Sequence, residues 1–159
     1  MTTIPRKWSK PKIAKMYEAF SAVADGRITM LDDQTASVAS SDRSKSYTVN
    51  WDVIGGAYGS NDNASHFVGY IGYPVIAVLI EQGKISVDRE LVNCLKGVNW
   101  NALNKRHKRD YDAAIEEVLE EVARGNVDPE EVRSEAKRAF DELLVLDIGR
   151  ISSTSRPVR

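Results

Sequence analysis

The sequence predicts an α+β protein: an N-terminal helix, an antiparallel meander of three to four strands, a central buried helix, and a C-terminal set of three helices. Three observations carry this prediction. Apolar residues recur with helical spacing near both ends of the chain, they alternate with polar residues between 27 and 60, and the most apolar run, 67–80, lies between these regions.

The first helix is expected to follow a flexible basic arm, residues 1–8. Ser9, Lys10 and Pro11 form a helix-start pattern with proline in the first turn. Gly26 is a natural stop. The apolar residues between them lie three or four positions apart: Ile13, Met16, Tyr17, Phe20 and Val23.

Residues 27–60 change to a two-residue period, which is typical of half-buried antiparallel strands. Strands are expected over 27–31, 35–41 and 46–52, and a short further strand could form over 55–60. The polar segments 41–45 and 60–66 are predicted turns or loops. They could flank the same edge of the meander, depending on the register.

The run from Gly69 to Gly83 could be a membrane segment, a phosphate loop or a buried helix. It is too short for the roughly 20 residues of a spanning helix, and Gly72 and Pro74 interrupt it. A phosphate loop needs successive backbone N–H donors and usually a Lys with Ser or Thr, whereas Pro74 removes a donor and no such pair follows. The sequence therefore predicts a buried helix, apolar on all sides, that begins at Pro74 and ends at Gly83.

Three further helices are expected after this one. Ser86 would cap a short helix that ends at Gly97, Asn99 would cap a long helix to about Arg124, and Asp128 precedes a proline that opens the last. The organisation is then one α+β domain, 9–146, with a helix-meander-helix part (9–83) and a helical part (84–146), and a flexible basic tail (147–159).

Composition limits the function classes. The net charge of −1 gives no overall field toward nucleic acid or anionic lipid, although residues 6–15 and 105–109 are locally basic. A single cysteine, Cys94, excludes an intrachain disulfide and a multi-cysteine metal site. With no apolar leader in the first 25 residues, we expect a cytoplasmic protein without membrane association.

Residues 45–83 combine the strand "SYTVN" with "AYGSNDNASHFVGYIGYPVIAVLIEQG". This order resembles the SWIM-type zinc modules, in which a strand ends in Cys-x-Cys and Cys-x-His opens an apolar helix. Tyr58 and Ser60 stand at the first pair of ligand positions, and Gly72 and Pro74 stand at the second. None of the four can build a tetrahedral zinc site. The resemblance implies a zinc-less ββα relative, stabilised by packing, that associates with nucleic acid or protein partners.

No set of residues indicates catalysis, a metal or a cofactor. His66 and His107 are the only histidines, and Asp62 with His66 is too small a ligand set. Cys94 lies on an apolar stripe and is expected to be a small buried hydrophobe. No Gly-x-Ser-x-Gly elbow occurs. We therefore assign no catalytic residue, no metal ligand and no cofactor.

The function predicted from the sequence is a non-catalytic binding module that contacts nucleic acid or a protein through its polar hairpin loops and basic patches. Two alternatives stay open. One is a small-molecule-binding domain or enzyme with a pocket between the meander and the buried helix. The other is a structural protein that oligomerises through its C-terminal helices. The predicted partner-binding residues are Arg43, Lys45, Asn61, Asn63, His66, Lys105, Arg106 and Arg109.

Overall fold

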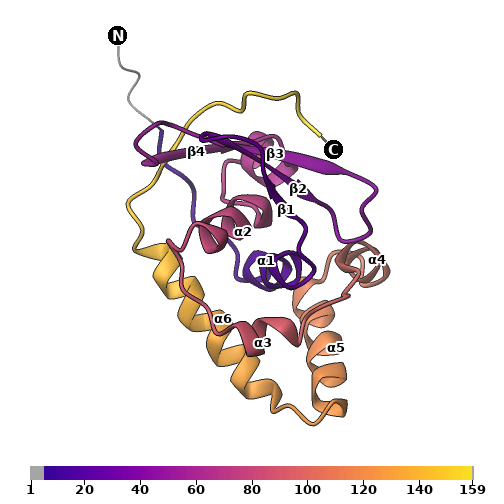
Figure 1. The fold of residues 1–159 in the computed structure, drawn as a ribbon. Coiled ribbons are helices and arrows are strands. Elements are labelled where there is room, and N and C mark those ends of the chain that lie inside the picture. Colours follow the sequence, from indigo (N-terminus) through magenta and orange to yellow (C-terminus); the bar gives the residue numbers. More distant parts are fainter. Residues whose placement is uncertain (1–5, 159) are drawn as a thin grey trace.

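A computed structural model describes residues 6–158 and shows the predicted α+β class (Figure 1). Its first half runs α1 (Ala14–Ala24), β1 (Ile28–Met30), β2 (Thr35–Ala39), β3 (Ser46–Trp51), β4 (Ala57–Ser60), a single-turn π-helix η1 (Ala64–Val68) and α2 (Tyr73–Glu81). Its second half runs α3 (Arg89–Asn93), α4 (Trp100–Arg106), α5 (Tyr111–Arg124), α6 (Pro129–Leu144) and β5 (Gly149–Arg150).

The five strands form one sheet in the order β1-β2-β3-β4-β5. The first four are antiparallel neighbours, which confirms the predicted meander. The fifth comes from the far end of the chain and pairs in parallel with β4, so that Tyr58 lies opposite Arg150. A two-residue strand has no hydrophobic period of its own, and sequence patterning therefore missed it.

Helices α1 and α2 cover one face of the sheet (Figure 1). Val38, Val49 and Tyr58 project from that face, and all three are fully buried. Ile76 and Leu79 of α2 are buried as well, because the helix lies between the sheet and α1. The predicted central helix is confirmed.

The helical part contains four helices where three were expected. The predicted long helix breaks after Arg106, and Lys108 and Arg109 adopt left-handed φ values of 54° and 67°. Asp110 then caps α5 by accepting from the backbone N–H of Ala113 at 3.1 Å. A straight helix would stack the like charges of Lys105 and Arg109 one turn apart, which is unfavourable.

Two predicted helix starts are also wrong. Asp88, and not Ser86, caps α3 by accepting from the N–H groups of Glu90 and Leu91. At the N-terminus, α1 begins only at Ala14 and has no side-chain cap. The start pattern at Ser9 is not used, because the Ser9 N–H donates to the carbonyl of Gly69 at 2.9 Å and keeps this segment extended.

Both ends of the described segment lie against the sheet. Residues 1–5 of the predicted basic arm and Arg159 lie outside the described residues. The tail 147–159 was predicted to be flexible. In the structure its segment 151–158 follows β5 and crosses the face of the sheet that the helices leave open (Figure 1). Asn50 donates to the carbonyl of Ser152 at 3.0 Å, and Asn61 donates to that of Arg156 at 2.8 Å. We call residues 151–158 the C-terminal strap.

Candidate anion-binding site

Arg6 and Arg150 form an isolated antiparallel bridge at the sheet edge. The N–H of Arg6 donates to the carbonyl of Arg150 at 2.9 Å, and the reverse bond is 2.6 Å long. Like charges directly opposite each other across a strand pair are destabilising. Burial lowers the pKa of Arg150, and the charge of Arg6 lowers that pKa further. Among residues 6–158, no carboxylate oxygen lies within 4.0 Å of either guanidinium.

The Arg150 side chain is held in one position. Its Nη2 donates to the carbonyl of His66 at 3.1 Å, and its guanidinium carbon lies 5.7 Å from the ring centroid of Trp8. Trp8 is itself fixed, since its Nε1–H donates to the carbonyl of Gly149 at 2.9 Å. Gly69 allows the close approach, because a Cβ there would lie 2.9 Å from Nη1 of Arg150. A guanidinium positioned in advance loses less entropy when it binds an anion.

A pocket of about 280 Å³ lies at this bridge. Its lining is Arg6, Ser60, Ser65, His66, Arg150, Ile151, Ser152 and Ser153. The lining holds two arginines, four serines and one histidine, and it holds no carboxylate. Such a set offers hydrogen-bond donors and positive charge to a bound group, which is the composition that an anion requires. We call it the Arg6–Arg150 pocket.

Two buried serines of the pocket have a hydroxyl proton left to donate. The oxygen of Ser65 accepts from the N–H of Gly72 at 3.2 Å, and the oxygen of Ser60 accepts from the N–H of Asp62 at 3.4 Å. Ser65 and Ser60 are 2% and 3% exposed. Neither hydroxyl donates a hydrogen bond within residues 6–158, so its O–H can donate to a ligand in the pocket.

Asp62 is the nearest acidic residue in sequence to these serines, and it does not line the pocket. One of its carboxylate oxygens accepts from the N–H of Ser65 at 3.1 Å, and the other has no hydrogen-bond partner among the described residues. Its charge acts on Tyr47, whose pKa is raised by burial and then by Asp62. Tyr47 lies beside Tyr73 of α2, with their ring centroids 6.1 Å apart.

The π-helix η1 places Ser65 and His66 at the pocket. Gly69 ends it with a left-handed φ of 92°, and the Gly69 N–H returns to the carbonyl of Ala64 at 2.8 Å. Single-turn π-helices are rare and occur frequently at functional sites. The sequence predicted only turns over 60–66, because the composition of this stretch does not distinguish a loop from a single π-turn.

A second, larger cavity adjoins the pocket on the open face of the sheet. Its volume is about 930 Å³, and we call it the outer-face groove. It shares Arg6, Arg150, Ile151 and Ser152 with the Arg6–Arg150 pocket. Its remaining lining residues are Asp32, Asp33, Gln34, Thr35, Asn50, Trp51, Asp52 and Thr154. A ligand held at the two arginines therefore has room to extend along the sheet.

The structure places the predicted hairpin residues as follows. Arg43 and Lys45 lie exposed in the β2–β3 turn, and Asn63 is exposed at the start of η1. Asn61 is only 4% exposed, so its assignment as a partner contact is wrong. Its side-chain oxygen accepts from the N–H of Thr48 at 2.8 Å while its amide holds the strap. Of the eight predicted residues, His66 alone lines the Arg6–Arg150 pocket.

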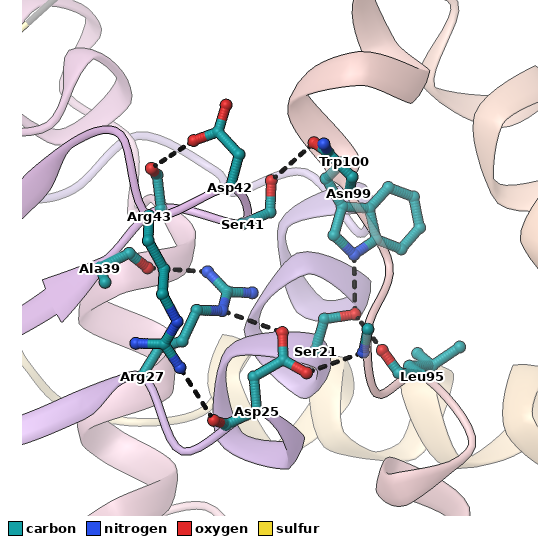
Figure 2. Close-up of polar contacts among 12 residues, drawn as sticks. Ser21, Asp25, Arg27, Ala39, Ser41, Asp42, Arg43, Leu95, Asn99 and Trp100 are labelled. Carbon is teal, nitrogen blue, oxygen red and sulfur yellow. Dashed lines mark hydrogen bonds and ion pairs between the residues drawn. The ribbon is translucent and has the colours of Figure 1, made fainter.

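Arg43 belongs to a polar network that joins the β2–β3 turn to the α3–α4 connection (Figure 2). Its guanidinium donates to the carbonyl of Asp25 at 3.3 Å. The Asp25 carboxylate accepts from Arg27 Nε at 3.1 Å and from the N–H of Gly97 at 2.7 Å. Ser41 bonds to Asn99, which caps α4. These contacts tie the β2–β3 turn to the end of α1 and to the α3–α4 connection.

None of the three predicted residues of the second basic run lines the pocket. Arg106 forms an ion pair with Glu117, and His107 Nε2 lies 3.1 Å from the same carboxylate. Lys105 and Arg109 are exposed near the end of α4. The helical break after Arg106 therefore separates these basic residues from α5, with which the sequence predicted one continuous helix.

Sequence reasoning missed both arginines of the site. Arg6 and Arg150 are 144 positions apart, and each stood in a segment that was predicted to be flexible. The sequence held one local indication of the site, the run of small polar residues "RISSTS" that begins at Arg150. Pairing between two such distant segments leaves no periodic pattern to read.

Within residues 6–158, no three His, Cys, Asp or Glu side chains are grouped so that they could hold a metal ion. None of the helices in that span has the length and apolar character needed to cross a bilayer.

Comparison with known proteins gives one match. A family model described as "Uncharacterised conserved protein UCP014422" matches residues 8–149. No curated protein and no solved structure matches the chain. The matched span includes Ser60, Ser65 and His66, and it ends immediately before Arg150. It adds no support for the SWIM-type resemblance, which stays a prediction.

Proposed function

The chain belongs to the family described as Uncharacterised conserved protein UCP014422, and from the geometry of its site we propose that it binds a phosphate-bearing small molecule between Arg6 and Arg150. One observation carries the proposal. The two guanidinium groups are brought together by backbone pairing without any neutralising carboxylate among residues 6–158. A bound dianion would turn this repulsion into attraction.

A phosphate monoester fits the donors of the pocket. It carries close to two negative charges and three strong acceptor oxygens at neutral pH. Arg6 and Arg150 can neutralise the negative charge of the phosphate. The hydroxyl groups of Ser60 and Ser65 can donate hydrogen bonds to its remaining oxygens. The pocket volume of about 280 Å³ suits a terminal phosphate group and its first attached atoms.

Calorimetric titration with inorganic phosphate tests the proposal, alongside thermal unfolding in phosphate and in chloride of equal ionic strength. Phosphate should raise the Tm of the wild-type protein, because a ligand that binds only the folded state stabilises it. Arg6→Gln should weaken phosphate binding about tenfold or more, since a charge-assisted hydrogen bond contributes about 1.5–3 kcal/mol. Arg6 has no side-chain hydrogen bond within the described residues, so this variant should fold.

Lys7→Gln is the matched control. It makes the same charge change one residue away, at an exposed side chain outside the pocket lining. We expect less than a twofold change in phosphate affinity for this variant. Equal responses of the wild-type protein and Arg6→Gln to phosphate would reject the proposal. Ser65→Ala, which removes one donor at a buried position, gives an independent second variant.

The binding of nucleic acid by the hairpin loops remains a second proposal. It is supported by the register, which places the 40–45 and 60–66 loops at the same end of the sheet. Arg43, Lys45 and Asn63 are exposed there. A combined Arg43→Gln and Lys45→Gln variant should lose salt-sensitive binding to a single-stranded oligonucleotide while keeping its phosphate response. Unchanged oligonucleotide binding, or none at low salt, would contradict it.

A further inference from the structure

The outer-face groove carries opposite charges at its two ends. Arg6 and Arg150 lie where it meets the Arg6–Arg150 pocket. Three carboxylates, those of Asp32, Asp33 and Asp52, line the same cavity. The groove volume of about 930 Å³ falls within the range of roughly 300–1,000 Å³ found for small-molecule sites. One ligand can therefore contact both charge types.

The fold brings the three carboxylates together by docking the β1–β2 turn onto the end of β3. The carbonyl of Gln34 accepts from the N–H of Trp51 at 3.0 Å, and Gln34 Nε2 donates to the Trp51 carbonyl at 3.3 Å. Asp32 and Asp33 immediately precede Gln34, and Asp52 immediately follows Trp51. Trp51 is 9% exposed, because its side chain packs beside Tyr58 on the helix-covered face of the sheet.

Local bonds hold two of the carboxylates and leave acceptor capacity free. One oxygen of Asp32 accepts from the N–H of Gln34 at 2.8 Å, and that bond is the main reason why its pKa is lowered. One oxygen of Asp52 accepts from the N–H groups of Gly56 and Ala57 at 2.7 and 3.3 Å. A carboxylate offers about four lone-pair sites for hydrogen bonds, so both groups keep acceptor capacity for a donor.

The acidic end has no cation of its own. In the part of the chain that the structure describes, no Lys, Arg or His nitrogen lies within 4.0 Å of these three carboxylates. Within residues 6–158, the Asp33 side chain makes no hydrogen bond or ion pair. A positively charged group at this end would offset the mutual repulsion of the carboxylates.

We propose that the ligand of this site is a phosphate ester that also carries a protonated amine, with its phosphate at Arg6 and Arg150 and its amine at Asp33 and the neighbouring carboxylates. This inference rests on the proposed function and narrows its ligand class. Phosphate esters of amino alcohols and of amino sugars have this chemistry. The chain between the two charged groups extends along the outer-face groove.

The test is a titration of the wild-type protein with two matched series of compounds. One series is ω-aminoalkyl phosphates of increasing chain length, and the other is alkyl phosphates in which a methyl group replaces the ammonium. At one chain length the amine should improve affinity at least fivefold over its methyl partner. Asp33→Asn should remove that gain and leave the affinity for alkyl phosphates unchanged.

Asp33→Asn keeps the fold, because the Asp33 side chain makes no bond within the described residues. Asp112→Asn, an equally exposed aspartate on α5, is the control and should keep the gain. If the alkyl phosphates bind but the amine gives no advantage at any length, this inference fails and the proposed function stands. A gain that survives Asp33→Asn also overturns it. If neither series binds, the proposed function fails and this inference with it.

Discussion

Arg6 and Arg150 face each other across a two-bond antiparallel bridge, with N···O distances of 2.9 and 2.6 Å. The pairing joins two segments that lie 144 positions apart, and it sets two positive charges side by side at the sheet edge. Backbone pairing alone does not explain why both positions hold arginine. An anion bound between the two guanidinium groups would offset their electrostatic repulsion.

Arg6→Gln should change stability in opposite directions with and without phosphate. In chloride the variant should be about 0.2–0.5 kcal/mol more stable than the wild type, because cross-strand repulsion is removed. In saturating phosphate the wild type should be the more stable protein, since it gains binding energy that the variant lacks. Urea unfolding in the two salts at equal ionic strength measures both signs. A variant that is less stable in both salts would show that Arg6 supports the fold directly.

Gly59→Ala should displace the C-terminal strap. A Cβ at this position would lie 2.6 Å from the carbonyl oxygen of Ile151 and 2.8 Å from that of Ser152. Hydrogen exchange should accelerate at the Ile151 and Val158 amides, which donate to Tyr58 and Asn61. Phosphate affinity should fall as well, because strap residues line the pocket.

Gly56→Ala is the control for this change. A Cβ at Gly56 meets no atom within 4 Å, so exchange in the strap and phosphate affinity should both match the wild type. Unchanged exchange at Ile151 in Gly59→Ala would mean that the strap tolerates the extra carbon by shifting.

Asn61→Ala should lower the free energy of unfolding by about 1–3 kcal/mol, because it leaves the N–H of Thr48 and the carbonyl of Arg156 without their bonds to Asn61. Asn63→Ala, at an exposed neighbour, should stay within about 0.5 kcal/mol of the wild type. Chemical denaturation of both variants measures the difference. Equal stability of the two variants would show that the fold does not need the Asn61 side chain, and Asn61 would again be a predicted partner contact.

Glu142 should contribute stability that is lost in acid. The N–H of Ser86 and, after it, the Arg138 guanidinium lower the pKa of this carboxyl from its ordinary 4.5. The folded state then binds a proton less readily than the unfolded chain. The contribution is complete above about pH 4.5 and disappears as the pH falls through the folded-state pKa.

Glu142→Gln should therefore destabilise the protein by about 0.5–1 kcal/mol at pH 7 and by less near pH 3. Urea denaturation at the two pH values measures the difference. Glu120→Gln, at an exposed residue with no partner among the described residues, should show no such pH dependence. Equal destabilisation by Glu142→Gln at both pH values would exclude a charge effect.

The sequence predicted correctly those helices and strands whose ends or apolar pattern are encoded by neighbouring residues. Pro74 and Gly83 mark the two ends of α2, and its apolar residues on every side require burial. The alternation in β3 likewise depends only on neighbouring residues. These features follow from propensity and from the period of the apolar pattern.

The candidate site is formed by contacts between residues far apart in the sequence, and no local sequence pattern encodes such contacts. The bridge between Arg6 and Arg150 joins two segments that each resemble a disordered end. The role of Asn61 was decided by the bonds of its side chain, because a polar residue beside a strand can face solvent or satisfy the backbone. The break after Arg106 arose where a good cap at Asp110 competed with continued helix.

The positions of Arg6 and Val158, at the two ends of the described segment, matter for anyone who handles this protein. Arg6 lies at the pocket, and Val158 bonds to Asn61, which follows the pocket residue Ser60 in sequence. An affinity tag or fluorescent fusion at either terminus would therefore join the chain only a few residues in sequence from Arg6 or Val158. Untagged material, or a long cleavable leader, is the safer choice for ligand screening.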